Sequence, residues 1–225
     1  MKIFLDQYTN STNLDNQIYN KNFPNGKQRS DYLLFDDKVI CEHKEILTFN
    51  IRNRVEIASK KNLSEQNLRR DIYTGIEKSL RTANQQIKDT KKQLDLPHSM
   101  GLVVLQNRIP EDISLLTLID AANRKMMNGL SEVDAVLCID FINTFSDPSG
   151  KSVQPIQIVV RNTENSNQLN KLVNELVNDF SIFLNRPLEK NCDILKGELS
   201  WTLDRDGKFK EHKASIIFSE NKSQT

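Results

Sequence analysis

The sequence predicts an α/β domain in which a mixed sheet is flanked by helices. Short apolar runs rich in strand-forming residues alternate along the chain with longer segments whose apolar residues recur every three or four positions. A length of 225 residues suffices for one sizeable domain, or for a core of about 150 residues with an extension. We expect a core over residues 1–145 and a C-terminal α+β extension over 146–225 that packs on it, separately or within one continuous domain.

The clearest local signal is a β-hairpin over residues 30–44, which read SDYLLFDDKVICEHK. Two runs of strand formers flank the turn-prone pair Asp36-Asp37. A two-residue turn at this pair, or a four-residue loop over 35–38, gives the same register and places Leu33 opposite Ile40. The pairing is therefore predicted without knowledge of the turn type.

The remaining elements follow from the apolar periodicity and from the breaks between periodic segments. Upstream of the hairpin, an asparagine-rich segment predicts a weak helix over residues 12–22. Downstream we expect a helix over 64–96, a buried strand over 101–106, a helix over 111–127, strands over 133–141 and 156–160, a helix over 167–184 and a hairpin over 199–218. The helix over 111–127 is expected to turn Ile113, Leu116, Ile119 and Ala122 toward the core.

Three charged side chains are expected to converge on one face of the first hairpin. Its register places Asp31 opposite Glu42, and the alternation of strand side chains turns Glu42 and Lys44 to one face and His43 to the other. Two carboxylates about 5 Å apart repel by roughly 3 kcal/mol at an effective dielectric constant near 20. A positive charge must therefore lie between them. Lys44 supplies one, and a hard divalent cation such as Mg²⁺ can supply the rest.

This combination of groups suits phosphodiester hydrolysis. A divalent cation lowers the pKa of a bound water and polarises a phosphoryl oxygen, and Lys44 can then position the nucleophile or stabilise the negative charge that develops on the phosphate.

Asp31, followed after ten residues by Glu42-His43-Lys44, resembles the signature of the PD-(D/E)xK nuclease superfamily. The resemblance covers roughly residues 1–107, and Ser30 stands where the family motif has a proline. It implies a restriction-endonuclease-like fold, whose core is a helix, a strand hairpin that carries the motif, a second helix and a further strand. It also implies an Mg²⁺-dependent endonuclease that accepts Mn²⁺.

The resemblance further implies roles for individual residues. Asp31 and Glu42 would be metal ligands, the main-chain carbonyl of His43 would join them, and Lys44 would lie beside the attacking water. Gln86 lies on the helix after the hairpin, where similar nucleases carry polar residues near the active site. We expect it either to hold a water or the phosphate, or to bond the backbone as a boundary residue.

Other functions remain open at this stage. The Asp/Glu-x-Lys pattern occurs six times in a chain that is 27% charged, but only the copy at Glu42 follows a buried-looking strand and faces an acidic residue. No glutamate precedes Glu42, so that the upstream acidic candidates are Asp6 and Asp15. The alternatives are a catalytically inactive nuclease-fold module for protein or nucleic-acid interaction, and a hydrolase of nucleotides or other small phosphate esters.

The net charge of +1 gives no global sign of a nucleic-acid partner. Basic residues nevertheless cluster after the hairpin and would form a rim that binds phosphates without reading sequence. This rim comprises Arg52, Arg54, Lys60, Lys61, Arg69, Arg70, Lys88, Lys91 and Lys92. We expect a nucleic-acid partner, DNA rather than RNA, with a restriction, repair or defence role. A homodimer or a protein partner is also compatible with the sequence.

Composition limits the location of the protein. No apolar run approaches the roughly 20 residues needed to cross a bilayer, and the N-terminus is too short in its apolar part for a signal peptide. The 3 cysteines are widely spaced and predict neither a disulfide framework nor a zinc cluster. The sequence therefore predicts a cytoplasmic protein without membrane association.

Overall fold

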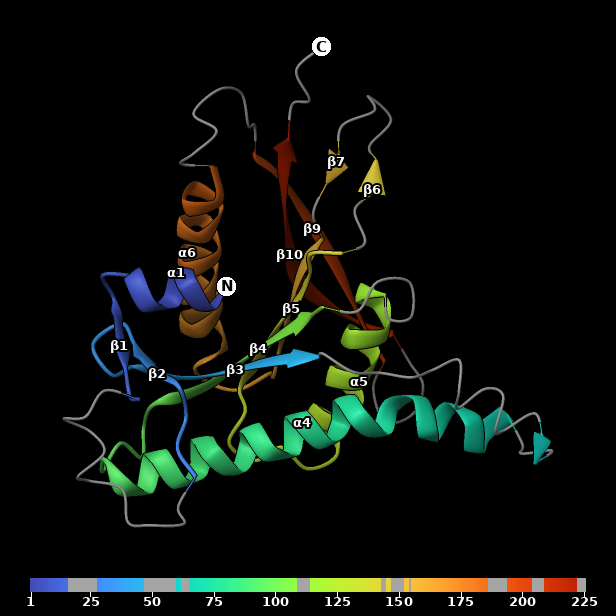
Figure 1. The fold of residues 1–225 in the computed structure, drawn as a ribbon, viewed down its shortest axis with the longest axis horizontal. Helices are drawn as coiled ribbons and strands as arrows, with labels where there is room; N and C mark the ends of the chain where they lie inside the picture. The colour runs from blue at the N-terminus through green and yellow to red at the C-terminus, as the bar shows by residue number, and fades with distance from the viewer. Residues whose placement is uncertain are drawn as a thin grey trace.

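The computed structural model of this chain describes residues 1–15, 28–46, 60–61, 65–108, 114–142, 145–146, 152–153, 155–185, 194–203 and 209–221. These residues form an α/β fold with a mixed sheet between helices, as the sequence predicts (Figure 1). The helices are α1 (Lys2–Gln7), α4 (Glu65–Gln93), α5 (Leu115–Met127) and α6 (Ser166–Asn185). The strands are β1 (Ser11–Asn13), β2 (Tyr32–Leu34), β3 (Val39–Ile46), β4 (Met100–Asn107), β5 (Ala135–Asp140), β6 (Phe145–Ser146), β7 (Ser152–Val153), β8 (Ile156–Val160), β9 (Ile194–Leu203) and β10 (Phe209–Asn221).

The strands pair in the order β1-β2-β3-β4-β5-β8-β10-β7-β6, and β9 pairs with β10. β1, β2 and β3 are antiparallel neighbours, whereas β3, β4 and β5 are parallel to one another. β8 then returns antiparallel to β5. The sheet is therefore mixed, and its centre consists of parallel strands joined by the crossover helices α4 and α5.

The first hairpin has the predicted register. Leu33 lies opposite Ile40, and the connection is the four-residue loop over 35–38 rather than a two-residue turn. Phe35, Asp36 and Asp37 have φ values of 56°, 53° and 65°. Aspartate adopts this left-handed region more readily than most residues do, because its short side chain can bond the nearby backbone. Phe35 is held there by burial of its ring in the core.

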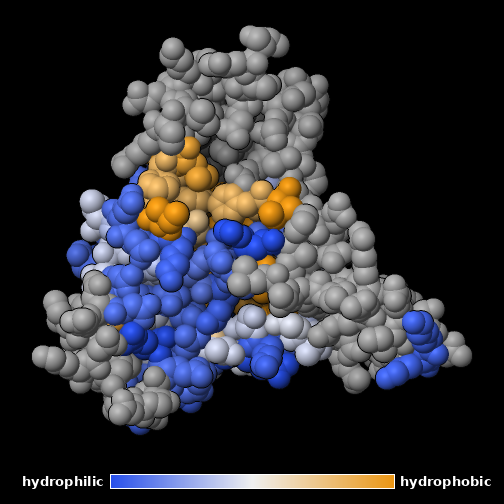
Figure 2. All heavy atoms as spheres, in the orientation of Figure 1, coloured by the Kyte–Doolittle hydropathy of each residue, from blue (hydrophilic) through white to orange (hydrophobic). Residues whose placement is uncertain are grey.

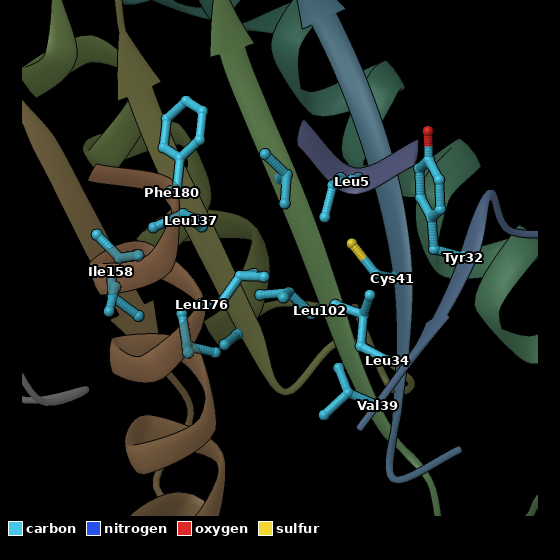
Figure 3. Close-up of a cluster of buried hydrophobic side chains, with 14 of the residues drawn as sticks. Leu5, Tyr32, Leu34, Val39, Cys41, Leu102, Leu137, Ile158, Leu176 and Phe180 are labelled. Atoms are coloured by element: carbon cyan, nitrogen blue, oxygen red, sulfur yellow. The ribbon is translucent and has the colours of Figure 1, made fainter. Parts of the chain in front are cut away.

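The central strands are buried on both faces, which explains why their sequences do not alternate between apolar and polar residues. All residues of β4 and β5 are buried. One apolar cluster lies between the sheet and the helices α1 and α6, and Figure 3 shows Leu176 and Phe180 of α6 within it, with Leu102 and Leu137 of the strands. A second cluster lies between the other face and the helices α4 and α5.

Helix α4 confirms the predicted long amphipathic helix and covers the second face. Among the side chains that the structure describes, from residue 73 onward, its buried apolar residues follow three- and four-residue spacing and are Ile76, Leu80, Ala83 and Ile87. This stripe contacts Ile40 and Ile46 of β3 within the second cluster. The side chains of β3 that point to this face, Glu42 and Lys44 among them, therefore point toward α4.

The prediction of a helix from residue 12 is wrong at its start. Residues 11–13 form strand β1, which pairs with β2, and the rest of the expected helix from residue 16 lies outside the described residues. Serine, threonine and asparagine have weak helix propensity, so pairing with the edge of the hairpin decides their conformation. The short helix α1, which precedes β1, was not predicted.

Helix α5 corrects the predicted core-facing stripe. Ile113 lies outside the described residues, and Leu116 is 65% exposed, whereas Leu118 is fully buried. A strict three-residue spacing drifts by about 60° per step on a helix of 3.6 residues per turn, so residues 113 and 122 would lie on opposite faces. Ala122 is buried and Ile119 packs partly buried against the second cluster, as predicted, but the buried face of the helix is the one that carries Leu118, Ala121, Ala122 and Met126.

The second half of the chain continues the same sheet. β8 pairs with β5, α6 packs in the same cluster as α1, and β10 pairs with both β8 and β9. The predicted helix over 167–184 and the C-terminal hairpin are confirmed, although the hairpin's turn lies outside the described residues. The division between residues 1–145 and 146–225 stays a prediction, and β5 and β8 pair across it. No helix of the described residues is long and apolar enough to cross a membrane.

Two leucines of α5 test the corrected packing. Leu118→Ala should lower the free energy of unfolding by about 2–5 kcal/mol, because it leaves a cavity at a fully buried position. Leu116→Ala should change it by less than about 0.5 kcal/mol, since that side chain is 65% exposed. Urea denaturation of both variants measures the difference. Equal losses would contradict this orientation of α5.

Candidate active site

The structure brings together the side chains of Asp31, Glu42 and Lys44. Asp31 directly precedes β2, in which Tyr32 pairs with Cys41 of β3. The Asp31 Oδ2 atom accepts a hydrogen bond of 2.8 Å from the backbone N–H of His43, which fixes this carboxylate against β3. Lys44 Nζ lies 2.5 Å from Glu42 Oε1. The predicted convergence on the α4 face of the hairpin is therefore present.

Glu42 is the most unusual member of the site. Its side chain is 1% exposed, and its Oε2 atom is buried without a hydrogen-bond partner. The pKa of Glu42 is raised from its ordinary value of 4.5 to about 7, because burial and, to a lesser extent, the negative charge of Asp31 raise it more than Lys44 and the Asp31 backbone lower it. One carboxylate oxygen is thus paired with an ammonium group, while the other is buried at a desolvation cost and has no hydrogen-bond partner.

Lys44 is held from two sides. Its Nζ atom donates to Glu42 Oε1 and, at 2.7 Å, to Gln86 Oε1 of α4. The amide nitrogen of Gln86 in turn donates to the backbone carbonyl of Arg29 over 2.8 Å. Gln86 therefore bonds the backbone, which is one of its two expected roles, and also orients the lysine of the site. Its contact with a water or a phosphate stays a prediction.

Thr90, one helical turn after Gln86, is a part of the site that the sequence did not reveal. Its buried hydroxyl oxygen accepts a hydrogen bond of 2.8 Å from the backbone N–H of Ser30. Gln86 and Thr90 thus fix the two residues that directly precede Asp31. The four-residue spacing of these side chains was visible in the sequence, but their target was not, because the pairing spans 60 residues.

The side chain of His43 points away from the site. Its Nε2 atom lies 3.1 Å from Gln106 Oε1 of β4, on the face that α1 and α6 cover. Burial lowers the pKa of His43, and the contact with Gln106 raises it. This position agrees with strand alternation. The role of the His43 carbonyl as a metal ligand stays a prediction.

Neither upstream acidic candidate joins the pair of carboxylates. Asp6 accepts hydrogen bonds from the Tyr32 hydroxyl over 2.9 Å and from Asn13 over 2.7 Å. Asp15 forms an ion pair of 2.7 Å with Arg29. Within the described part of the chain, no group of three or more His, Cys, Asp or Glu side chains is arranged to hold a metal ion.

The two carboxylates nevertheless fit a hard divalent cation. Mg²⁺ is commonly held by one or two carboxylates and completes its octahedral shell with waters and substrate oxygens, so it does not require a third protein side chain. The Oε2 atom of Glu42 has no hydrogen-bond partner and is an oxygen ligand of the kind that such an ion prefers. Asp31 and Glu42 would hold it.

The expected basic rim is only partly described. Lys88 and Lys92 of α4 are exposed, as are Lys60 and Lys61, whereas Lys91 forms an ion pair of 3.1 Å with Glu132. Arg52 and Arg54 lie outside the described residues, and so do the side chains of Arg69 and Arg70. Exposed lysines on α4 therefore lie on the helix that also contributes Gln86.

Comparison of the chain with protein-family models, with curated proteins and with solved structures finds no match.

The raised pKa of Glu42 predicts a pH dependence of stability in metal-free protein. Because the folded state holds this proton more tightly than the unfolded state, the associated stabilisation is complete below about pH 4.5 and is lost as the pH rises through about 7. The loss amounts to about 3 kcal/mol, at 1.36 kcal/mol for each pKa unit. Denaturant titrations of the wild type and of Glu42→Gln at several pH values should diverge in this window. A difference in the free energy of unfolding that stays the same at every pH would contradict the raised pKa of Glu42.

Two threonines of α4 test how the backbone before Asp31 is fixed. Thr90→Val should lower the free energy of unfolding by about 1–3 kcal/mol, because the buried N–H of Ser30 loses its acceptor. Thr82→Val is the matched control, since its hydroxyl only donates to Lys78 O of the same helix at the surface, and it should change stability by less than about 0.5 kcal/mol. Chemical denaturation measures both. Equal effects would remove Thr90 from the site.

Proposed function

We propose that this chain is a metal-dependent nuclease of the PD-(D/E)xK type with a restriction-endonuclease-like core, and that it hydrolyses phosphodiester bonds in DNA. The order of elements supports the proposal. Helix α1, the hairpin of β2 and β3, helix α4 and strand β4 follow one another as that core requires, with β4 parallel to β3. The residues of the motif lie at the matching positions, with Asp31 before β2 and Glu42 and Lys44 on β3.

The observation that carries the proposal is the buried, half-satisfied carboxylate of Glu42. Replacing a buried ionisable group by a well-packed apolar one is often neutral or stabilising, so a purely structural role gives little reason to keep it. A divalent ion would contact the unpartnered Oε2 atom and offset the repulsion from Asp31. The same ion would stabilise the ionised form of Glu42 at neutral pH.

The chain's own groups would divide the chemistry between them. A bound divalent ion would supply Lewis acidity toward a phosphoryl oxygen and lower the pKa of a water. Asp31 and Glu42 would hold it, with Asp31 oriented by the His43 N–H. Lys44, fixed by Gln86, would donate hydrogen bonds to the attacking water and to the charge that develops on the phosphate.

The exposed lysines of α4 support a polyanionic substrate. Lys88 and Lys92 lie on the helix that borders the site, and such residues contact phosphates without distinguishing bases. Lys88 and Lys92 lie on the outer side of α4 relative to Gln86, so that a phosphodiester chain that extends past the site could contact them, whereas a single nucleotide would occupy only the site. We therefore prefer nucleic acid to a small phosphate ester as the substrate.

One observation favours a second candidate function, a catalytically inactive nuclease-fold module that binds nucleic acid or protein. Asp6 and Asp15, the acidic residues before Asp31, are engaged with Tyr32 and Arg29 and do not reach Glu42. A site with two carboxylates binds metal more weakly than one with three, and it would suffice for a binding module. The two candidates differ in whether the bound nucleic acid is cut.

Nuclease assays test the proposal. The purified chain should cut plasmid or linear duplex DNA with Mg²⁺ or Mn²⁺ and not with EDTA. Glu42→Gln and Lys44→Met should each lower the rate by at least about 100-fold, because they remove a metal ligand and a charge-stabilising donor. Glu45→Gln is the matched control, since Glu45 lies on the same strand and faces the opposite side, and its activity should stay within about twofold of the wild type.

Two outcomes would contradict this function. Equal residual cutting by the wild type and by both site variants would identify a contaminating nuclease. Absence of cutting of duplex DNA, single-stranded DNA and RNA, together with nucleic-acid binding that survives Glu42→Gln, would favour the inactive module.

A further inference from the structure

A pocket lies on the face of the sheet opposite to the candidate active site. It has a volume of about 240 Å³ and lies between α1, the residues that follow α1, and the last turns of α6. Its walls include Phe4, Tyr8, Asp179, Ile182 and Phe183. Since α1 and α6 cover one face of the sheet and α4 covers the other, no group of this pocket takes part in the proposed hydrolysis.

Aromatic rings form much of the pocket wall. The ring centroid of Phe4 lies 5.0 Å from that of Tyr8 and 5.4 Å from that of Phe183, and both pairs are tilted. The faces of such rings carry negative electrostatic potential and attract a cation within about 6 Å of the centroid. Phe4 and Tyr8 are 4% and 8% exposed and Phe183 is half-buried, so a flat, positively charged group in the pocket would contact mainly the Phe183 ring.

A carboxylate completes the wall. Asp179 Oδ2 accepts a hydrogen bond of 3.0 Å from the Tyr8 hydroxyl, which leaves most of the roughly four acceptor positions of this carboxylate for a ligand. Glu175 lies one turn earlier on α6 and, with Asp179, contributes to a raised pKa of about 12 for Tyr8, whose main cause is burial. Like charges four residues apart on a helix cost about 0.2–0.5 kcal/mol, which a cation bound between them would relieve.

No lysine or arginine side chain among the described residues pairs with Asp179 or Glu175. The described ion pairs of the chain lie elsewhere, around Asp15, Glu42, Glu45, Glu77, Asp120 and Glu132. The negative charge at this pocket is therefore complementary to a cation, and none of the described residues provides that cation.

Exposed apolar side chains border the pocket. Ile182 is 48% exposed, and Ile3, which lies one helical turn before the wall residue Gln7 on α1, is 68% exposed. Figure 2 shows an apolar patch over α6, next to α1. Exposed apolar patches mark protein–protein interaction sites, and aromatic residues are enriched at such interfaces.

The size of the pocket limits its occupant. Sites for drug-sized ligands and cofactors usually enclose about 300–1,000 Å³, and this pocket is smaller. A single long side chain fits such a volume. Arginine is favoured over lysine, because its planar guanidinium stacks on rings and forms two parallel hydrogen bonds to a carboxylate.

We propose that this pocket binds an arginine side chain of a partner protein, with the guanidinium on Asp179 and the aromatic rings, and with apolar neighbours of that arginine packed on Ile3 and Ile182. The surface is an anchor for a protein partner on the face away from the proposed cleavage site. A partner bound there would not contact Asp31, Glu42 or Lys44, which lie on the other face of the sheet.

A peptide titration of the full chain tests this site. Isoleucine δ1-methyl groups are labelled, and the blocked peptide acetyl-Leu-Arg-Leu-amide is added at millimolar concentration. The methyl signals of Ile3 and Ile182 should shift saturably. The neutral isostere with citrulline in place of arginine should bind at least about tenfold more weakly, because it lacks the charge-assisted contact with Asp179.

Variants separate the pocket from non-specific binding. Asp179→Asn keeps an acceptor for the Tyr8 hydroxyl and should weaken binding of the arginine peptide by at least about tenfold. Asp120→Asn is the matched control, since it removes an exposed carboxylate of α5 on the other face of the sheet, and it should leave the affinity unchanged. Methyl spectra without peptide verify that both variants are folded.

Several results would overturn the proposal. These are the absence of a saturable shift, equal affinity for the arginine and citrulline peptides, or equal affinity of the wild type and Asp179→Asn. Analytical ultracentrifugation at several protein concentrations tests whether a second copy of this chain occupies the pocket. Dimerisation that Asp179→Asn abolishes would identify a second copy of this chain as the occupant and would overturn the assignment to a different protein.

Discussion

The candidate site depends on the cost of burying the Glu42 carboxylate on a strand that is otherwise apolar. Lys44 compensates one of its oxygens, Gln86 fixes Lys44, and Gln86 and Thr90 together hold the backbone before Asp31. Helix α4 therefore has two roles, since its apolar stripe closes the core and its polar flank orients the charged groups. A carboxylate in this environment is stable only if cations remain close to it, and this requirement relates the packing of the fold to the proposed metal chemistry.

The sheet separates two chemically different faces. Alternation along β3 turns Glu42 and Lys44 toward α4, and turns Cys41 and His43 toward α1 and α6. The α4 face carries the buried carboxylate of Glu42 and the half-buried carboxylate of Asp31, and exposed lysines lie on α4 itself, an arrangement that would suit the polyanionic substrate and the metal that we propose. The other face ends in a recess of aromatic rings around Asp179, which suits a cation. Because a closely packed sheet lies between them, the protein partner and the nucleic acid that we propose would bind on separate faces.

The hairpin register and the alternation of β3 could be predicted because both follow from spacing within fifteen residues, where the chain has little freedom. The long helix and the buried parallel strands could be predicted equally well, since their apolar patterns extend over many residues. The predictions failed where the pattern was short or drifted. Leu116 was assigned to the core by a strict three-residue spacing, which does not stay on one face of a helix. Residues 11–13 form a strand because the edge of the hairpin offers hydrogen bonds that their weak helix propensity does not outweigh.

The sequence by itself determined which side chains can meet on one strand, namely Glu42 and Lys44 on one face and His43 on the other, because a pleated backbone alternates its side chains without reference to the rest of the molecule. Only the tertiary structure decided that Thr90 bonds the backbone of Ser30, that Asp6 and Asp15 do not reach Glu42, and that Asp179 meets Tyr8 across 171 residues. Such contacts join elements that are distant in sequence. Their geometry depends on how helices pack on the sheet, and local patterns carry no information about that packing.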